Sequence, residues 1–291
     1  MRFGLIGTGY WAREVHAAGL AQTAEAELVG VWGRDQDKAA VVTERFGGRP
    51  YARPEELFDD VDAVAFAVPP DVQAPLAVQA ANRGCHLLLE KPIALDAGQA
   101  DALVEAAEAN DVASVVFFTS RFLSEVEDWL TEVCSRDDWT GASAIWLGSI
   151  FRPGSPFADS PWRKRWGALW DVGPHALSVV LPVMGAVAEV TAARGPKDTA
   201  HLILRHTSGA SSSLVVSLTA PEQAVRVSMS VYGEPGWSDM PRRADVEPVE
   251  RLSEAAQALI RSADTGSTHD VDVRFGGEVV HILARAQAAM G

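Results

Sequence analysis

Residues 3–12 read Phe3-Gly4-Leu5-Ile6-Gly7-Thr8-Gly9-Tyr10-Trp11-Ala12, a short apolar run followed by two glycines and a small residue. The run is typical of a buried β-strand, and we place a strand at 2–6 and an amphipathic helix at 10–22. Between them, Gly7 permits a tight turn, Gly9 lets the backbone approach a pyrophosphate, and Ala12 lets the helix pack closely on the strand. This stretch predicts a dinucleotide-binding loop whose ligand contacts come from Gly7, Thr8, Gly9, Tyr10 and Trp11.

The same alternation of short apolar runs and amphipathic helical stretches continues to residue 118. It is the signature of a parallel sheet with crossover helices, so we predict an α/β fold with a doubly wound Rossmann domain over 1–118. Asp71 and Asp96 are placed as helix N-caps. The predicted strands lie at 2–6, 28–32, 62–67, 85–89 and 114–118, and the predicted helices at 10–22, 35–46, 71–83 and 96–110.

The pattern changes after residue 119, where strands follow one another without long crossover helices, as in an antiparallel sheet. We predict a substrate-binding and oligomerisation domain of α+β type over 119–291, with an open, mainly antiparallel sheet. A loop and helix at 151–184 concentrate tryptophans and basic residues and are interpreted as a substrate lid or wall. The other predicted helices lie at 121–134, 250–262 and 270–289, and the predicted strands at 142–150, 187–193, 200–206, 211–218 and 225–231.

Composition narrows the classes of function. The 291 residues include 25 Lys and Arg against 39 Asp and Glu, and this net charge of -14 argues against a nucleic-acid partner. No run approaches the roughly 20 apolar residues that a membrane span needs. Met1-Arg2 leads directly into a strand rather than a signal peptide, so we expect a cytoplasmic protein. Cys85 and Cys134 have no metal-ligand spacing, and we predict two reduced thiols and no metal site.

Trp32-Gly33-Arg34 ends the second predicted strand, where NAD-selective sites place an acid that binds the ribose hydroxyl. Here the acid is missing, Gly33 leaves room for a 2'-phosphate, and Arg34 can grip that phosphate or stack on the adenine. We therefore predict NADP as the cofactor, with NAD as the alternative. The competing interpretation makes Arg34 a solvated turn residue and lets Asp35 serve the ribose or cap the next helix.

Glu90-Lys91-Pro92 follows the strand predicted at 85–89 and so lies at the carboxyl edge of the sheet, where ligands of such folds bind. Beside a nicotinamide, Lys91 can hydrogen-bond the reacting oxygen, with a pKa tuned by burial and by Glu90. Pro69, Glu90 and Lys91 are added to the predicted cofactor contacts. A charged pair after a strand is more often a solvated edge, and only its place after the glycine loop makes this one informative.

Several motifs occur together in one order, and with them the chain resembles the Gfo/Idh/MocA family of oxidoreductases. The resemblance spans most of the chain. Its motifs are the loop from Gly7 to Ala12, Val68-Pro69-Pro70-Asp71, Gly84-Cys85-His86 leading to Glu90-Lys91-Pro92, Arg121-Phe122, and Gly167-Ala168-Leu169-Trp170-Asp171-Val172-Gly173-Pro174-His175.

The resemblance implies that Lys91 is the catalytic lysine. It also implies that Asp171 and His175 are the family's Asp and His, of which the His donates or accepts the proton of the substrate oxygen. Taken alone, Asp171 and His175 are four apart, so in one helix they share a face and the carboxylate can orient the imidazole. Pro174 suits a first turn, which offers a cap position for Asp171 instead. Gln73 departs from the family, which often has histidine there, so a polar contact on the nicotinamide side is expected to differ.

The resemblance and the motifs together predict reversible hydride transfer between a nicotinamide and a secondary alcohol or ketone of a sugar, polyol or related small molecule. Arg121, Trp162 and Arg163 are the candidate substrate contacts. The cations of 152–165 can hold an anionic substrate or be solvated. A homodimer or homotetramer is expected, and the rival functions are an NAD-dependent glycosidase-type enzyme, a non-catalytic dinucleotide sensor, and a reductase of a bilin or imine.

Overall fold

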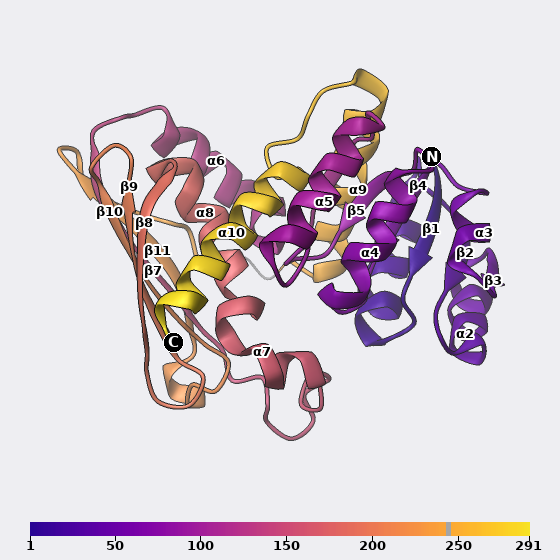
Figure 1. The fold of residues 1–291 in the computed structure, drawn as a ribbon, viewed down its shortest axis with the longest axis horizontal. Helices are drawn as coiled ribbons and strands as arrows, with labels where there is room; N and C mark the ends of the chain where they lie inside the picture. The colour runs from indigo at the N-terminus through magenta and orange to yellow at the C-terminus, as the bar shows by residue number, and fades with distance from the viewer. Residues whose placement is uncertain (243–245) are drawn as a thin grey trace. The chain divides into compact units, whose positions relative to one another are not determined.

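The computed structural model describes residues 1–242 and 246–291 (Figure 1). The chain divides into two compact units, and each unit is built from two segments. The first comprises Met1–Phe122 and Val246–Val280, and the second Leu123–Asp245 and His281–Gly291. Residues 246–280 thus return to the N-terminal unit, a return that the predicted boundary at 118/119 does not include.

The first unit contains a six-stranded parallel sheet in the order β3-β2-β1-β4-β5-β6. This order confirms the predicted Rossmann fold, with strands at the five predicted places and one more. The additional strand is β3, whose three residues include Pro50, so its sequence carries too little periodicity to be recognised. The strands are β1 (Arg2–Ile6), β2 (Glu27–Trp32), β3 (Arg49–Tyr51), β4 (Ala63–Phe66), β5 (His86–Leu89) and β6 (Ser114–Val116).

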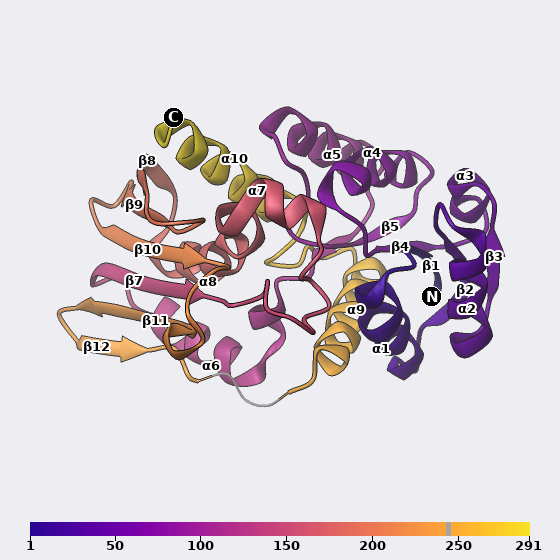
Figure 2. The ribbon, with the colours of Figure 1, turned by 90° about the horizontal axis from the view of Figure 1, so that it is seen from below.

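Helices cover both faces of this sheet, with α4 and α5 on one face and α1 and α9 on the other (Figure 2). Asp96 is an N-cap as predicted, since its carboxylate accepts the Gln99 N–H at 2.9 Å. The prediction for Asp71 is wrong, because α4 begins one residue earlier with Pro69 as its N-cap. The helices are η1 (Ala12–Ala17, a π-helix), α1 (Ala18–Gln22), α2 (Gln36–Phe46), α3 (Pro54–Phe58), α4 (Pro70–Ala81), α5 (Ala97–Ala109), η2 (Thr119–Phe122) and α9 (Pro248–Thr265).

The second unit contains a six-stranded mixed sheet in the order β12-β11-β7-β10-β9-β8. Its neighbours pair antiparallel except for β7 and β10, which are parallel. The predicted open, mainly antiparallel sheet is therefore confirmed, with the short β12 added. The strands are β7 (Trp139–Leu147), β8 (Val187–Arg194), β9 (Ala200–His206), β10 (Ser211–Ser217), β11 (Arg226–Gly233) and β12 (Gly236–Asp239).

One face of this second sheet carries the helices. Along β9, Leu202 and Leu204 are buried while the alternating His201, Ile203 and Arg205 are exposed, so β9 has one packed and one open face. Figure 1 shows the helices on a single side of the sheet. They are α6 (Ser124–Cys134), α7 (Pro161–Asp171), α8 (Gly173–Met184) and the second half of α10 (Val273–Ala289), and a 3-10 turn, η3 (Glu222–Ala224), joins β10 to β11.

Candidate active site

The loop after β1 has the geometry that its two glycines predict. Gly7 has φ +133°, and a Cβ there would lie 2.5 Å from the Ala67 carbonyl oxygen, so only glycine fits. A Cβ on Gly9 would meet no atom within 4 Å, which leaves the backbone at this point open to a ligand. The loop lies between β2 and β4, whose crossovers run to opposite sides, and this switch point is where doubly wound sheets bind ligands. The residues present therefore fit a dinucleotide.

The segment after β2 separates the two interpretations of Gly33, Arg34 and Asp35. A Cβ on Gly33 would approach the Thr8 side chain to 2.5 Å, so packing against the glycine loop already accounts for this glycine. Asp35 caps α2 by accepting the Lys38 N–H at 3.2 Å. Arg34 is exposed and makes no hydrogen bond or ion pair with residues 1–242 or 246–291. Its guanidinium is thus available to a ligand.

Lys91 follows β5 as a buried residue with 9% of its surface exposed, and the peptide bond to Pro92 is cis. Both oxygens of the neighbouring Glu90 carboxylate accept hydrogen bonds. Its Oε1 accepts the Trp11 indole N–H at 2.5 Å and lies 3.0 Å from His16 Nε2, while Oε2 accepts the Lys91 backbone N–H at 3.3 Å. Glu90 therefore anchors the turn to the helix that follows the glycine loop.

Gln73, where the family often has histidine, has a fully buried side chain that bonds the turn that carries Lys91. The amide accepts the backbone N–H of Glu90 at 2.8 Å and donates to the Glu90 carbonyl at 2.8 Å. It also lies within donating distance of the Pro92 and Ile93 carbonyls, at 3.2 and 3.3 Å. These roles of Gln73 and His16 were not predicted from the sequence, where the only sign of His16 is one histidine in an amphipathic helix.

The carboxyl edge of the first sheet thus carries nearly all the predicted cofactor residues, because parallel strands end at one edge. The glycine loop follows β1, Arg34 follows β2, Pro69 follows β4 and Lys91 follows β5. Arg121, a predicted substrate contact, lies in η2 after β6, and its side chain is buried with 6% exposed.

The second unit holds the other predicted residues, and here one prediction is wrong. Asp171 and His175 do not share a helix, because α7 ends at Asp171 and α8 begins at Gly173. Pro174 lies in the first turn of α8, as its type favours. The cap residue between the helices is Val172, so Asp171 is not a cap either. His175 lies in the first turn of α8, half-buried.

Asp171 is buried and holds one of the predicted substrate residues. Its Oδ2 accepts the Arg163 Nε–H at 2.9 Å, and the Arg163 guanidinium lies 4.6 Å from the Trp162 ring centroid and 4.5 Å from that of Phe157. Two other cations of the lid segment are paired, Arg152 with Glu222 at 3.5 Å and Lys164 with Asp159 at 3.1 Å. The structure thus brings Trp162, Arg163 and Asp171 together within the second unit.

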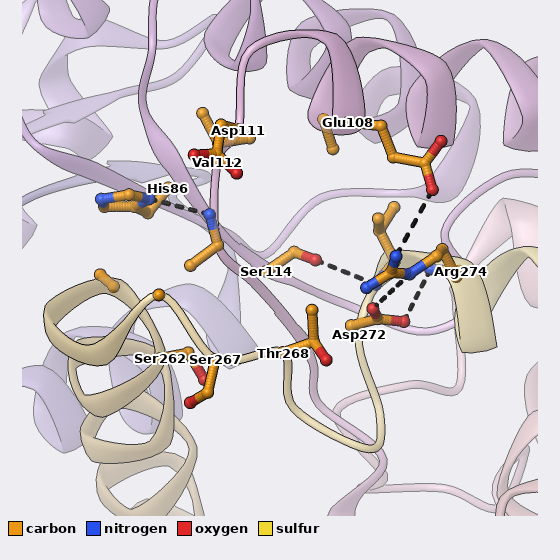
Figure 3. A pocket seen from close by; sticks show the side chains of 15 residues that line it. His86, Glu108, Asp111, Val112, Ser114, Ser262, Ser267, Thr268, Asp272 and Arg274 are labelled. Carbon is orange, nitrogen blue, oxygen red and sulfur yellow. Dashed lines mark hydrogen bonds and ion pairs between the residues drawn. The ribbon is translucent and has the colours of Figure 1, made fainter.

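A cavity of about 360 Å³ opens at the amino edge of β5 and β6, opposite to the glycine loop (Figure 3). Several of its polar groups are already bonded within the protein: His86 Nδ1 accepts the Ala113 N–H at 3.0 Å, and Arg274 pairs with Asp272 at 2.8 Å and with Glu108 at 3.6 Å. These bonds account for the charged pair and the histidine of the lining.

In the part of the chain that the structure describes, no group of three or more His, Cys, Asp and Glu side chains is arranged to hold a metal ion. None of the helices described is both long and apolar enough to cross a membrane.

Comparison with known proteins identifies both units. Residues 1–118 match the family model described as "Oxidoreductase family, NAD-binding Rossmann fold", and residues 145–238 match that of the "GFO/IDH/MocA C-terminal domain". The two matched segments lie one in each half of the chain and follow the order that the sequence motifs predict.

Individual relatives are similar over different shares of the chain. Glucose-6-phosphate 3-dehydrogenase of Bacillus subtilis is 29% identical over 62% of this chain. The matched region spans about half (52%) of that protein's length. D-xylose 1-dehydrogenase (NADP(+)) 2 of Haloferax volcanii is 26% identical, with 94% of this chain and 92% of that protein covered. The solved structure of UDP-N-acetylglucosamine 3-dehydrogenase from Acidithiobacillus ferrooxidans has the same fold, with a TM-score of 0.83 at 21% identity over 100% of this chain and 97% of that one.

Proposed function

Because the chain belongs to the Gfo/Idh/MocA family of oxidoreductases, we propose that it transfers a hydride between a nicotinamide dinucleotide and a secondary alcohol or ketone of a sugar-like molecule. One observation in the structure supports this most. The open glycine loop after β1 and the buried Lys91 after β5 lie at the same edge of one sheet, separated by β4 alone. Strands lie about 4.8 Å apart, so these two strand ends are roughly 10 Å from each other.

In this proposal the bound dinucleotide supplies the hydride acceptor or donor. The loop from Gly7 to Trp11 holds its pyrophosphate, with Pro69 and Glu90 beside it. Lys91 hydrogen-bonds and polarises the substrate oxygen, and His175 takes the hydroxyl proton during oxidation and returns it during reduction. Asp171 orients His175 or Lys91 in this proposal, in addition to accepting the hydrogen bond from Arg163.

The substrate class rests on the relatives, whose names place their chemistry on sugars. The test is a spectrophotometric screen of NADP reduction and NADPH oxidation against sugars, polyols and keto-sugars. Lys91→Ala and His175→Ala are each expected to lower kcat by a factor on the order of 10² or more while dinucleotide binding is retained. Near-normal turnover in both variants removes these two assignments, and dinucleotide that copurifies without net turnover points to a redox-neutral enzyme instead.

We propose NADP over NAD because of Arg34, which is exposed at the end of β2 and has no protein partner among the described residues. The neighbouring charged residue, Asp35, is already bonded as the cap of α2. Arg34→Ala is expected to lower the ratio of kcat/KM for NADP to that for NAD by about tenfold or more. Arg261→Ala, which removes an exposed guanidinium from α9, is the matched control. A strong NAD preference that Arg34→Ala leaves unchanged overturns this choice.

We also propose that the chain forms a homodimer or homotetramer through the open face of the second sheet. Ile203 is 51% exposed on that face and lies in register with Thr191 of β8 and Ser213 of β10, so an apolar side chain is surrounded by small ones. Light scattering after size-exclusion chromatography tests the state. Ile203→Lys is expected to shift the protein toward the monomer, and a monomeric wild type overturns the proposal.

The cytoplasm stays the proposed location. Neither Cys85, which is buried, nor Cys134, which is exposed, takes part in a disulfide among the described residues, and reduced cysteines are usual in the cytoplasm. Cell fractionation of a tagged chain tests it, and recovery outside the cytoplasmic fraction contradicts it.

A further inference from the structure

The side chain of Gln73 forms hydrogen bonds with the backbone of the turn Glu90-Lys91-Pro92. Gln73 comes from the first turns of α4, and its amide bonds the N–H and the C=O of Glu90, both at 2.8 Å. The same NH2 group reaches the carbonyls that follow Lys91, at Pro92 and Ile93. The partners set the amide's orientation, because a backbone N–H needs an oxygen acceptor and carbonyls need N–H donors.

These hydrogen bonds fix the backbone both before and after Lys91 in the sequence. The backbone groups fixed by Gln73 belong to the residue before Lys91 and to the two residues after it. The Gln73 amide is fully buried with its hydrogen bonds made, and removal of its NH2 donor would leave the carbonyls of Glu90, Pro92 and Ile93 without that partner. The bonds of Gln73 therefore act on the backbone from which the Lys91 side chain starts.

A second anchor acts on the same turn through the Glu90 carboxylate. Trp11 and His16 both approach Oε1, and they lie on the helical segment that begins at the glycine loop. His16 is fully buried, and its Nδ1 has no hydrogen-bond partner among the described residues. The tautomer that carries its proton on Nε2, and donates it to Glu90, therefore satisfies the geometry. The turn is thus tied to α4 on one side and to the glycine loop on the other.

We propose that Gln73 is a positioning residue, which sets the place of Lys91 through the backbone of Glu90, Pro92 and Ile93. The inference rests on the proposed hydride transfer, because it names what holds the lysine of that site. A general acid or a polarising group loses on the order of 10²-fold in rate when it is displaced by about 1 Å, so the effect belongs in kcat rather than in dinucleotide affinity.

The decisive variant is Gln73→Glu, which keeps the shape and the acceptor for the Glu90 N–H. An ionised carboxylate cannot donate to the three carbonyls, whereas a protonated carboxyl regains one O–H donor. Burial raises the pKa of an introduced carboxyl. We therefore expect kcat about tenfold or more below that of the wild type near pH 8, and a ratio to the wild type that rises severalfold as the pH is lowered to about 6.

The matched control is Gln79→Glu, on the same helix α4, because the Gln79 side chain makes no hydrogen bond with the described residues. Gln73→Met removes the amide altogether and should lower kcat at every pH without the recovery. If Gln73→Met does not fold, Gln73→Glu carries the test, because it keeps the shape of the side chain and the acceptor for the Glu90 N–H. Unchanged turnover of a folded Gln73→Glu variant at pH 8 overturns the inference.

A readout without turnover uses the lysines themselves. The chain has four, and Lys38, Lys164 and Lys197 are exposed while Lys91 is buried. Under limiting amine acylation followed by mass spectrometry, Gln73→Glu and Gln73→Met should change the labelling rate of Lys91 severalfold and leave the other three within about twofold. A general loss of structure would instead be seen in the thermal unfolding of the whole chain.

The outcomes separate the two claims. A wild type that neither binds a nicotinamide dinucleotide nor turns over any substrate overturns the proposed function. A wild type that turns over, with Gln73→Glu and Gln73→Met within twofold of Gln79→Glu in kcat and in Lys91 labelling, overturns the positioning role alone. A pH-independent ratio for Gln73→Glu also contradicts it, because the lost donor would then not be the cause.

Discussion

Gly7 and Gly9 are two residues apart in one loop, yet different physical reasons make each of them glycine. Gly7 combines a positive φ with a backbone oxygen that would lie 2.5 Å from any Cβ. Gly9 has neither constraint, so nothing within the protein itself excludes a side chain there. What excludes one is the proposed pyrophosphate.

A pair of variants separates these reasons. Gly7→Ala is expected to lower the free energy of unfolding by about 2 kcal/mol or more, since it adds a clash to an unfavourable φ. Gly9→Ala should leave the free energy of unfolding within about 0.5 kcal/mol but weaken dinucleotide binding about tenfold. Chemical denaturation and fluorescence titration measure the two quantities. Unchanged affinity in a well-folded Gly9→Ala variant would mean that the pyrophosphate does not pass over this residue.

Local motifs of the site could be predicted from the sequence, whereas the distant residues that support them could not. The glycine loop and Lys91 are readable because each motif is local and its neighbours along the chain specify its setting. The partners of Glu90 are 79 and 74 positions away, at Trp11 and His16, and Gln73 is 17 away. No local pattern encodes which distant backbone groups a buried amide will meet, so the supports of the lysine emerged only from the fold.

At the scale of elements, long periodic segments were predicted and short or interrupted ones were not. The strands β1, β2 and β5 carry strong apolar runs, whereas β3 has three residues and one is proline. The helix predicted across Asp171 and His175 is interrupted at Val172, and α7 itself bends at Gly167, where φ is +67°. Helical spacing alone does not register such a break, because tertiary packing decides whether a helix continues.

The amino ends of β5 and β6 provide a test of pH dependence at this scale. His86, at the start of β5, accepts the Ala113 N–H before β6. Burial lowers the pKa of His86 from its ordinary value of 6.5, and the carboxylates of Asp62, Asp264 and Asp111 oppose this only in part. The folded chain therefore binds this proton more weakly than the unfolded chain does, and the imidazole favours unfolding once the pH falls below about 6.5.

His86→Asn keeps an acceptor for the Ala113 N–H but removes the titration. As the pH falls from about 7.5 to 5, the free energy of unfolding of the wild type is expected to decrease more steeply than that of the variant. Above pH 7.5 the two curves should have the same slope. Urea denaturation at a series of pH values measures both curves. Parallel curves would contradict the direction of the pKa shift, since carboxylates elsewhere titrate equally in the two proteins.

At the scale of the whole molecule, the chain crosses from the first unit to the second and then returns. The returning segment 246–280 completes the first unit rather than decorating it. On α9, Leu252 and Leu259 are fully buried, and a Cβ added to Gly19 would lie 2.8 Å from Leu252, so α9 crosses α1 at close range. After α9, the Val271 carbonyl accepts the Val116 N–H at 2.8 Å at the free edge of β6.

These contacts predict that the Rossmann motif is insufficient to fold alone. Each fully buried leucine contributes about 1.5–3 kcal/mol, so loss of Leu252 and Leu259 removes a large share of the roughly 5–15 kcal/mol that stabilises a domain. A fragment of residues 1–122 is therefore expected to unfold without a cooperative transition. The same fragment joined through a flexible linker to 246–280 should unfold cooperatively and bind NADPH. Circular dichroism melts and dinucleotide titration of both proteins decide the matter, and a cooperative melt of 1–122 alone, at a temperature near that of the joined protein, would show that the returning segment is dispensable.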